Sequence, residues 1–173
     1  MAYINIHLSS LHFTLWSDII NHTDILLISF TSNHSQYFIL NIYSDSFHSA
    51  LKYLKDIKVN IDNVLVMTGN FNIRNSLWDP SFPYHSSISD DLLLIADSFQ
   101  LALLMHTNPY STRYSDIAGE VNSTIDLMFL RYRSTELNQY SIHPDWWLTS
   151  DHAPLSITVP IVDETINTSK LSI

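Results

Sequence analysis

Two short polar motifs in this sequence carry side chains suited to phosphate chemistry. The motif Gly-Asn-Phe-Asn at residues 69–72 directly follows the apolar run 64–67, and the motif Ser-Asp-His at 150–152 precedes the largely apolar segment 155–159. Each motif therefore lies at one end of an expected buried strand, which is where α/β enzymes commonly build a site. Together, their amide, carboxylate and imidazole groups suggest metal-assisted phosphodiester chemistry.

The second motif places a carboxylate next to an imidazole. Neighbouring side chains of an extended segment point to opposite sides, so we do not expect Asp151 and His152 to pair directly. Nor do they form a serine-protease triad with Ser150, because the members of such a triad meet through the fold. A histidine here can polarise a phosphoryl oxygen, and a carboxylate can bind a metal or orient an imidazole. In the alternative interpretation, Ser150 and Asp151 cap a turn and His152 is an ordinary surface residue.

A single acid, Asp126, interrupts the apolar segment 123–130. Burying a carboxylate without a partner is energetically costly. Strand alternation places Ile125 and Leu127 on one face and Asp126 with Met128 on the other. Asp126 therefore either has a partner, such as a histidine whose cation it would stabilise, or faces water on a half-exposed strand.

The first motif offers two amides. Alternation directs Asn70 and Asn72 to one side and Phe71 towards the core. The amides can donate to phosphate oxygens or orient a water, but asparagine is also typical of a simple turn. Gly69 is one of only two glycines in the chain, and we expect it where the backbone needs it, at the sharp turn after a strand.

The elements expected to position these motifs mix strands and helices, which indicates a layered α/β or α+β fold. Residues 36–68 have the pattern of strand–helix–strand, a candidate crossover unit, and the polar stretches 70–89 and 111–122 are expected loops. The expected strands cover 1–8, 23–30, 36–43, 63–68, 101–105, 123–130, 139–143 and 153–161. One expected helix begins at Asp45 or Ser46 and buries Phe47, Ala50, Leu51, Leu54 and Ile57, and a second begins at Ser89 and buries Leu92, Leu93, Ile95, Ala96 and Phe99.

Composition points to one folded intracellular domain. With 173 residues, of which 46% are apolar and 14% charged, the chain can bury a core and is not disordered. The absence of cysteine excludes disulfides and thiolate metal sites. The first residues lack the basic start of a secretory signal, and no apolar run approaches the roughly 18 residues of a membrane span. We therefore expect a nuclear or cytoplasmic protein.

The net charge of −9 argues against a generic nucleic-acid-binding protein, whose affinity comes largely from Lys and Arg at phosphates. Lys52, Lys55 and Lys58 do cluster, but at helical spacing opposite an apolar face. A solvated helix face is the better interpretation of these lysines.

Five motifs follow one another in the order of a known superfamily. They are Asn-Ile-Tyr at 41–43, Gly-Asn-Phe-Asn at 69–72, Trp-Asp-Pro at 78–80, Ser-Thr-Ile-Asp at 123–126 and Ser-Asp-His-Ala-Pro-Leu at 150–155. The chain resembles the endonuclease/exonuclease/phosphatase superfamily, particularly the endonuclease domain of fungal non-LTR (LINE-type) retrotransposons. The resemblance implies a four-layer α/β sandwich of two packed β-sheets flanked by helices over 1–162, with a polar tail at 163–173. It also implies Mg²⁺-dependent hydrolysis of DNA, without a nucleotide cofactor, a membrane partner or a defined oligomeric state.

The resemblance also assigns roles to single residues. Tyr43 matches the tyrosine that helps to place the scissile phosphate, and Asn72 the asparagine that orients the attacking water. Asp126 matches the acid that pairs with the catalytic histidine. His152 matches that histidine, which stabilises the pentacovalent phosphate, and Asp151 matches the acid next to the metal ion.

Two departures lower the expected activity. The superfamily motif is Gly-Asp-x-Asn, whereas Asn70 here has an amide, which can neither accept a proton nor activate a water electrostatically. Losing a general base typically slows a reaction by about 10²–10⁴-fold. The superfamily's Asn and metal-binding Glu precede the first strand of this chain, so we expect an incomplete first sheet with an exposed edge at 1–8 or 23–30. Mg²⁺ binding would then rest on Asp151 and its neighbours.

We therefore expect a retrotransposon-derived endonuclease fold whose hydrolytic activity is weak or absent. Two other functions stay open. The exchange at Asn70 is compatible with a non-enzymatic module that binds a protein or a nucleic acid. The net charge of −9 fits DNA poorly and is compatible with a phosphatase that acts on a small phosphoester.

Overall fold

The centre of the fold is a mixed β-sheet. The computed structural model describes residues 12–32, 34–57, 61–105, 111–132, 139–146 and 150–159, and in this part six strands pair in the order β1-β2-β3-β4-β6-β5. A separate two-stranded sheet pairs β7 with β8. The strands are β1 (Phe13–Leu15), β2 (Ile25–Ser32), β3 (Ser35–Tyr43), β4 (Val64–Asn70), β5 (Leu101–Leu103), β6 (Asp126–Arg131), β7 (Gln139–Ile142) and β8 (Leu155–Thr158).

A crossover connects the two central strands. β3 and β4 pair in parallel, and α1 (Ser49–Ile57) lies between them in the sequence. The strand–helix–strand unit predicted over 36–68 is thus confirmed. The start of α1 is fixed by Asp45, whose carboxylate accepts a 2.9 Å hydrogen bond from the Ser49 N–H and so caps the helix.

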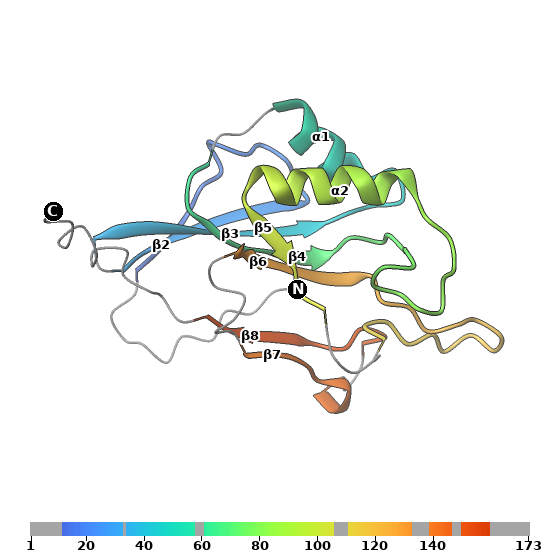
Figure 1. The fold of residues 1–173 in the computed structure, drawn as a ribbon. Helices are drawn as coiled ribbons and strands as arrows, with labels where there is room; N and C mark the ends of the chain where they lie inside the picture. Colours follow the sequence, from blue (N-terminus) through green and yellow to red (C-terminus); the bar gives the residue numbers. More distant parts are fainter. Residues whose placement is uncertain are drawn as a thin grey trace, which may run out of the picture.

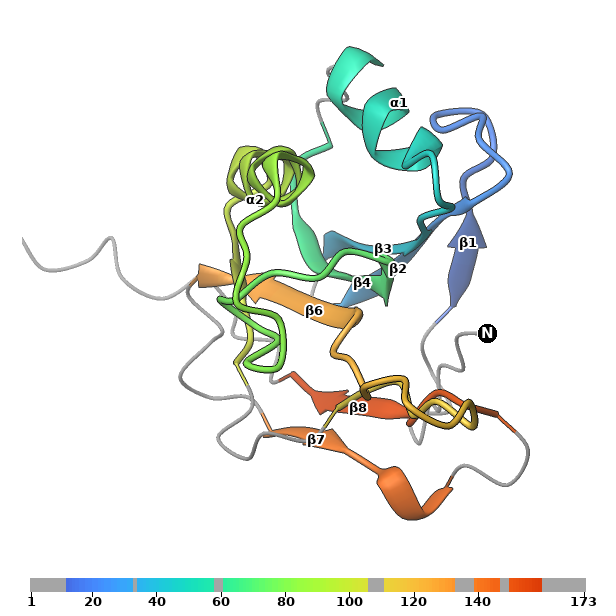
Figure 2. The same ribbon diagram turned by 90° about the vertical axis from the view of Figure 1, so that its right-hand side faces the viewer.

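The elements form layers. Figures 1 and 2 show α1 and α2 (Ser87–Ser98) on one face of the six-stranded sheet and β7 and β8 on the other. Leu127 and Phe129 of β6 are buried on the helix side, whereas Met128 and Leu130 pack towards β7 and β8. Alternation along β6 therefore directs Asp126 towards the second sheet, on the face that the sequence predicted for it. The α/β class with two packed sheets is confirmed.

Several predicted boundaries were wrong by a few residues. α2 begins at Ser87, slightly before the prediction. β6 begins at Asp126, later than the prediction, and Ser123 forms an isolated bridge with Arg113 in the preceding loop. Phe47 was expected on the buried face of the first helix, yet it lies in the turn before α1 and is 75% exposed. β2 is not an edge strand, because β1 and β3 pair along its two sides.

Three predictions fall outside the described residues: the strand at 1–8, the tail at 163–173 and the position of Lys58. Among the helices that the structure describes, none is long and apolar enough to cross a membrane.

Candidate active site

The register of three neighbouring strands places three predicted site residues in one row. Tyr43 at the end of β3 lies opposite Asn70 at the end of β4, and Asn70 lies opposite Asp126 at the start of β6. The side chain of Tyr43 is 53% exposed at the open side of this row. One edge of the sheet thus brings together a phenol, an amide and a carboxylate that are far apart in the sequence.

Gly69 permits the close approach of β3 and β4 at this row. It has a φ of +145°, and a Cβ added to it would lie 1.8 Å from the carbonyl oxygen of Ile42 on β3. No side chain fits at that distance, and the φ value itself disfavours any residue other than glycine. The expectation that the backbone requires Gly69 is confirmed.

The Gly-Asn-Phe-Asn motif forms an Asx turn. The Asn70 side-chain oxygen accepts a 2.9 Å hydrogen bond from the Asn72 N–H, and Asn72 adopts a φ of +51°. The Asn72 side chain donates to the Ser44 carbonyl at 2.7 Å. Phe71 is fully buried and packs edge-on against Phe129 of β6. The turn interpretation is confirmed, and Phe71 is the core anchor that the sequence predicted.

Asp126 has a histidine partner. Its Oδ2 lies 2.8 Å from His152 Nδ1, and the two side chains are 16% and 29% exposed. The hydrogen bond to Asp126 raises the pKa of His152, against an opposing effect of burial. The charge of Asp126 also acts on Tyr140 of β7, and burial together with this charge raises the pKa of the Tyr140 phenol to about 12. The partnered interpretation of Asp126 is confirmed over the solvent-facing one.

Asp151 lies closer to His152 than alternation predicted. Its Oδ1 is 3.8 Å from His152 Nε2, which is beyond hydrogen-bond distance but close enough for charge interaction. The expectation that the two side chains point apart was therefore wrong. The reason is that residues 150–153 do not form a strand, since β8 begins only at Leu155.

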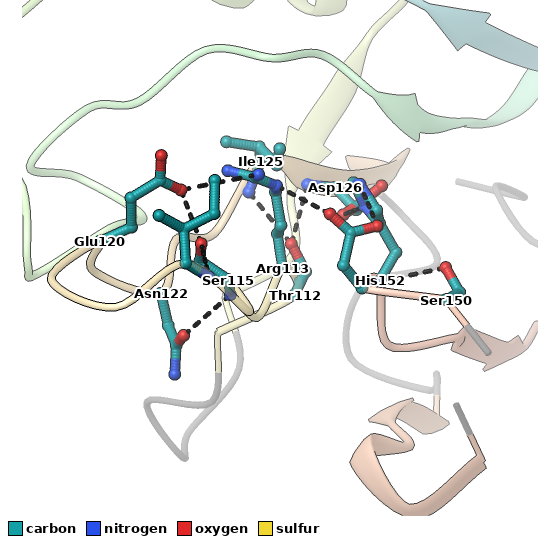
Figure 3. A network of polar contacts seen from close by, with 11 residues as sticks. Thr112, Arg113, Ser115, Glu120, Asn122, Ile125, Asp126, Ser150 and His152 are labelled. Atoms are coloured by element: carbon teal, nitrogen blue, oxygen red, sulfur yellow. Dashed lines mark hydrogen bonds and ion pairs between the residues drawn. The ribbon is translucent and has the colours of Figure 1, made fainter. Parts of the chain in front are cut away.

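Arg113 is a site residue that sequence reasoning missed. Its Nε donates to Asp151 Oδ2 at 3.1 Å, and its Nη2 lies 3.9 Å from Glu120 Oε2 (Figure 3). The segment 111–122 was predicted as a polar loop only. No spacing pattern links Arg113 to Asp151, because the two are 38 residues apart and meet only through the fold.

A buried threonine ties the Arg113 segment to β6. The Thr112 hydroxyl is fully buried and accepts 3.0 Å hydrogen bonds from the N–H groups of both Ile125 and Asp126. The Thr112 carbonyl accepts a 2.7 Å hydrogen bond from the Ala153 N–H, directly after His152. Thr112 therefore holds both partners of the Asp126–His152 pair.

The Trp-Asp-Pro motif shapes a loop. The Trp78 indole donates to the Ile73 carbonyl at 3.0 Å, and the buried Asp79 forms a 2.7 Å ion pair with Arg74. Asp79 also accepts a hydrogen bond from the Ser81 N–H at 3.2 Å. These contacts give the long segment between β4 and α2 a fixed conformation.

The donor set does not fit a divalent metal ion. Mg²⁺ favours several oxygen ligands, carboxylates above all, in octahedral geometry. Asp151, the predicted metal residue, is bound to Arg113, and the Asn70 oxygen is used in the turn with Asn72. In the part of the chain that the structure describes, no group of three His, Asp or Glu side chains is placed to hold a metal. The chemistry of the site must therefore be argued from its own side chains.

The sequence matches a known protein family. A model of the protein family described as endonuclease-reverse transcriptase matches residues 33–156 of the chain. No curated protein matches the sequence.

Solved structures share the fold at low sequence identity. The endonuclease domain of TRAS1, a telomere-specific non-LTR retrotransposon, has a TM-score of 0.70 at 14% identity and covers 91% of this chain and 73% of its own. The AP endonuclease LMAP from Leishmania major has a TM-score of 0.60 at 13% identity and covers 85% and 61%. A mutant of beta toxin from Staphylococcus aureus with bound magnesium ions has a TM-score of 0.46 at 12% identity and covers 78% and 57%. The first two likenesses establish the fold.

Proposed function

Because the chain belongs to the endonuclease-reverse transcriptase family, as the match over residues 33–156 shows, we propose that its site binds a DNA phosphodiester and hydrolyses it slowly or not at all. The domain is of the endonuclease/exonuclease/phosphatase type. The observation that carries the proposal is the 2.8 Å contact between His152 and Asp126, where Asp126 lies in one row with Asn70 and Tyr43. We propose that the domain acts inside the cell, in the nucleus or the cytoplasm.

His152 is the phosphate-contacting group in this proposal. Its Nδ1 is occupied by Asp126, so the ring presents Nε2 to a ligand. Because Asp126 raises the pKa of His152, more of the imidazole is protonated near neutral pH than in an unpaired histidine. A protonated Nε2 donates a charge-assisted hydrogen bond to a phosphate oxygen and stabilises the negative charge that develops there.

Asn70 accounts for the low expected rate. Its amide cannot take a proton from an attacking water, and its oxygen is already the acceptor in the turn with Asn72. Tyr43, exposed at the end of the row, is the group we expect to position the phosphate. Asn72 is expected to orient the water, with its side-chain nitrogen held by Ser44.

A plasmid-nicking assay with Mg²⁺ present tests the proposal. We expect little nicking by the native chain and a gain of about 10²–10⁴-fold with Asn70→Asp, which restores a general base. Adding His152→Ala to the Asn70→Asp variant should remove this gain in nicking rate. His85→Ala is the matched control, because His85 pairs with Asp90 on the surface of α2 and should have no effect. Robust nicking that survives His152→Ala would show that the assigned roles are wrong.

A second candidate substrate is a small phosphoester. The net charge of −9 repels a DNA polyanion but opposes a single phosphate group much less. Release of phosphate from small monoesters, measured with the same four proteins, separates the two functions. Turnover of a monoester without any binding of DNA would favour the phosphatase.

A further inference from the structure

Arg113 lies beside Asp151, where the family resemblance places a metal ion. Its guanidinium donates to Asp151 Oδ2 at 3.1 Å and also lies near Glu120. The carboxylate that a divalent ion would need is therefore already neutralised by a permanent cation. Figure 3 shows the Arg113 side chain between Glu120 and the Asp126–His152 pair.

The backbone of Arg113 is fixed independently of its side chain. Its N–H donates to the Ser123 carbonyl at 2.8 Å, and its carbonyl accepts from the Ser123 N–H at 3.0 Å. The N–H of the following residue, Tyr114, donates to the Asp151 carbonyl at 2.7 Å. The backbone of Arg113 is thus held by a pair of hydrogen bonds to Ser123, and a change of the side chain leaves these backbone bonds available.

Asp151 brings two nitrogen donors close together. One of its oxygens accepts from Arg113, and the other lies 3.8 Å from His152 Nε2. A guanidinium has five N–H donors in a fixed fork, and the contacts with Asp151 and Glu120 involve only Nε and Nη2. With its side chain 34% exposed, Arg113 can offer further donors to a ligand that contacts His152.

We propose that Arg113 is the cation of this site, and that it binds a phosphodiester oxygen together with His152 in place of a divalent metal ion. The inference rests on the proposed function, since it concerns the same phosphate. Arginine suits this role because it stays charged at any physiological pH and its fork matches the geometry of a phosphate. Binding of DNA by this chain therefore does not need Mg²⁺.

Three carboxylates face these two donors and limit the affinity. Asp126 is bound to His152 and Asp151 to Arg113, so the charge of each is largely compensated. Glu120 has the loosest contact with Arg113, is 46% exposed, and accepts a 2.6 Å hydrogen bond from Ser115. Removing its charge with Glu120→Gln should therefore strengthen the binding of phosphate.

The test measures binding of fluorescein-labelled duplex DNA by fluorescence anisotropy at low salt, in EDTA and in Mg²⁺. We expect equal affinity under both conditions for the native chain. Arg113→Gln should bind DNA about tenfold more weakly, which is the size expected for one charge-assisted hydrogen bond. Arg113→Lys should lose less of the affinity for DNA. Arg131→Gln is the matched control, because Arg131 lies at the other end of β6 and donates to Asn63 at 3.1 Å. Circular dichroism checks that each variant is folded.

Two results would overturn the inference: native binding that requires Mg²⁺, or an Arg113→Gln chain that binds as the native chain does. Loss of binding in His152→Ala but not in Arg113→Gln would leave the proposed function standing and reject the inference alone. Loss in Arg113→Gln but not in His152→Ala would reject the role of His152 in the proposed function, and with it the joint binding of phosphate by the two residues. If Arg113→Gln does not fold, Glu120→Gln decides, and an affinity no higher than native would count against the role of Arg113.

Discussion

The Asp126 carboxylate determines what His152 can do. It binds Nδ1 at 2.8 Å, which fixes the ring and leaves Nε2 as the nitrogen that meets a ligand. It also raises the pKa of the ring, while burial and the nearby Arg113 lower it. The net effect raises the pKa of His152, so the contact with Asp126 favours the protonated form that the proposed function requires.

We expect the His152–Asp126 pair to stabilise the fold more at low pH than at high pH. The folded pKa of His152 lies above its ordinary value of 6.5, so its stabilising effect is fully present below that value and is lost as pH rises through the folded pKa. Asp126→Asn should therefore lower the free energy of unfolding more near pH 6 than near pH 8. Urea denaturation of both proteins across this window measures the difference.

His48 does not affect the comparison between the native chain and Asp126→Asn. Burial lowers its pKa, so its stabilising effect is present at high pH and is lost as pH falls, which is the opposite sense. Both proteins contain His48, and its effect cancels in the difference between them. A difference in stability that stays constant with pH would contradict the expected role of the pair.

Gly69→Ala should destabilise the protein by more than about 2 kcal/mol, because it combines a backbone clash with a strained φ. The added Cβ would lie 1.8 Å from the Ile42 carbonyl oxygen, and strands β3 and β4 would have to separate at the site. Gly119→Ala is the matched control, since Gly119 has a φ of +93° but no atom within 4 Å of the added Cβ. Urea denaturation should show a clearly smaller loss for Gly119→Ala, and equal losses would mean that the clash is relieved.

At the scale of the elements, the site is an assembly of β6, the 111–123 segment and the residues before β8. Thr112 connects all three through its hydroxyl and its carbonyl. Because its hydroxyl is the acceptor for two buried N–H groups, it is more than a packing residue. The position of His152 relative to Asp126 therefore depends on a residue that contacts no ligand.

Thr112→Val tests this dependence. Valine has the shape of threonine but leaves the N–H groups of Ile125 and Asp126 without an acceptor, at a cost of about 1–3 kcal/mol each. We expect lower stability and, through misplacement of His152, weaker binding of DNA. Thr112→Ser keeps the hydroxyl and should retain most of the stability and most of the affinity for DNA. A loss from Thr112→Ser as large as that from Thr112→Val would contradict a role that rests on the hydroxyl.

The sequence predicted those parts of the site that depend on local pattern. Alternation within β6 predicted the face of Asp126, and the position of Gly69 after a strand predicted its unusual backbone. The contact between Arg113 and Asp151 was not predictable, because it joins a loop to a turn 38 residues away without any periodic signal. Phe47 was wrongly predicted on the buried face of α1, because the helical spacing of apolar residues extends upstream of the actual start of the helix. The Asp45 cap sets this start at Ser49.

At the scale of the whole molecule, the charge balance restricts how DNA can be bound. The chain has eight Lys and Arg residues against 17 acids. Lys55 forms a 2.7 Å ion pair with Asp91 of α2, and Arg74 is paired with the buried Asp79. The lysines of α1 are thus a solvated helix face, as the sequence suggested for Lys52 and Lys55, and they form no basic groove. Arg113 and His152 are the two residues of the described site to which we assign the binding of phosphate.

This restriction predicts a shallow salt dependence of DNA binding. Each phosphate neutralised by a cation contributes about −0.9 to the slope of log affinity against log salt concentration, so one or two contacts give a slope of roughly −1 to −2. Anisotropy titrations over a series of KCl concentrations measure the slope, and Arg113→Gln should make it shallower by about 1. Lys52→Gln is the control and should leave it unchanged, because Lys52 lies on the exposed side of α1. A steep slope, as for proteins with roughly six or more phosphate contacts, would instead require a basic surface other than the Arg113–His152 site.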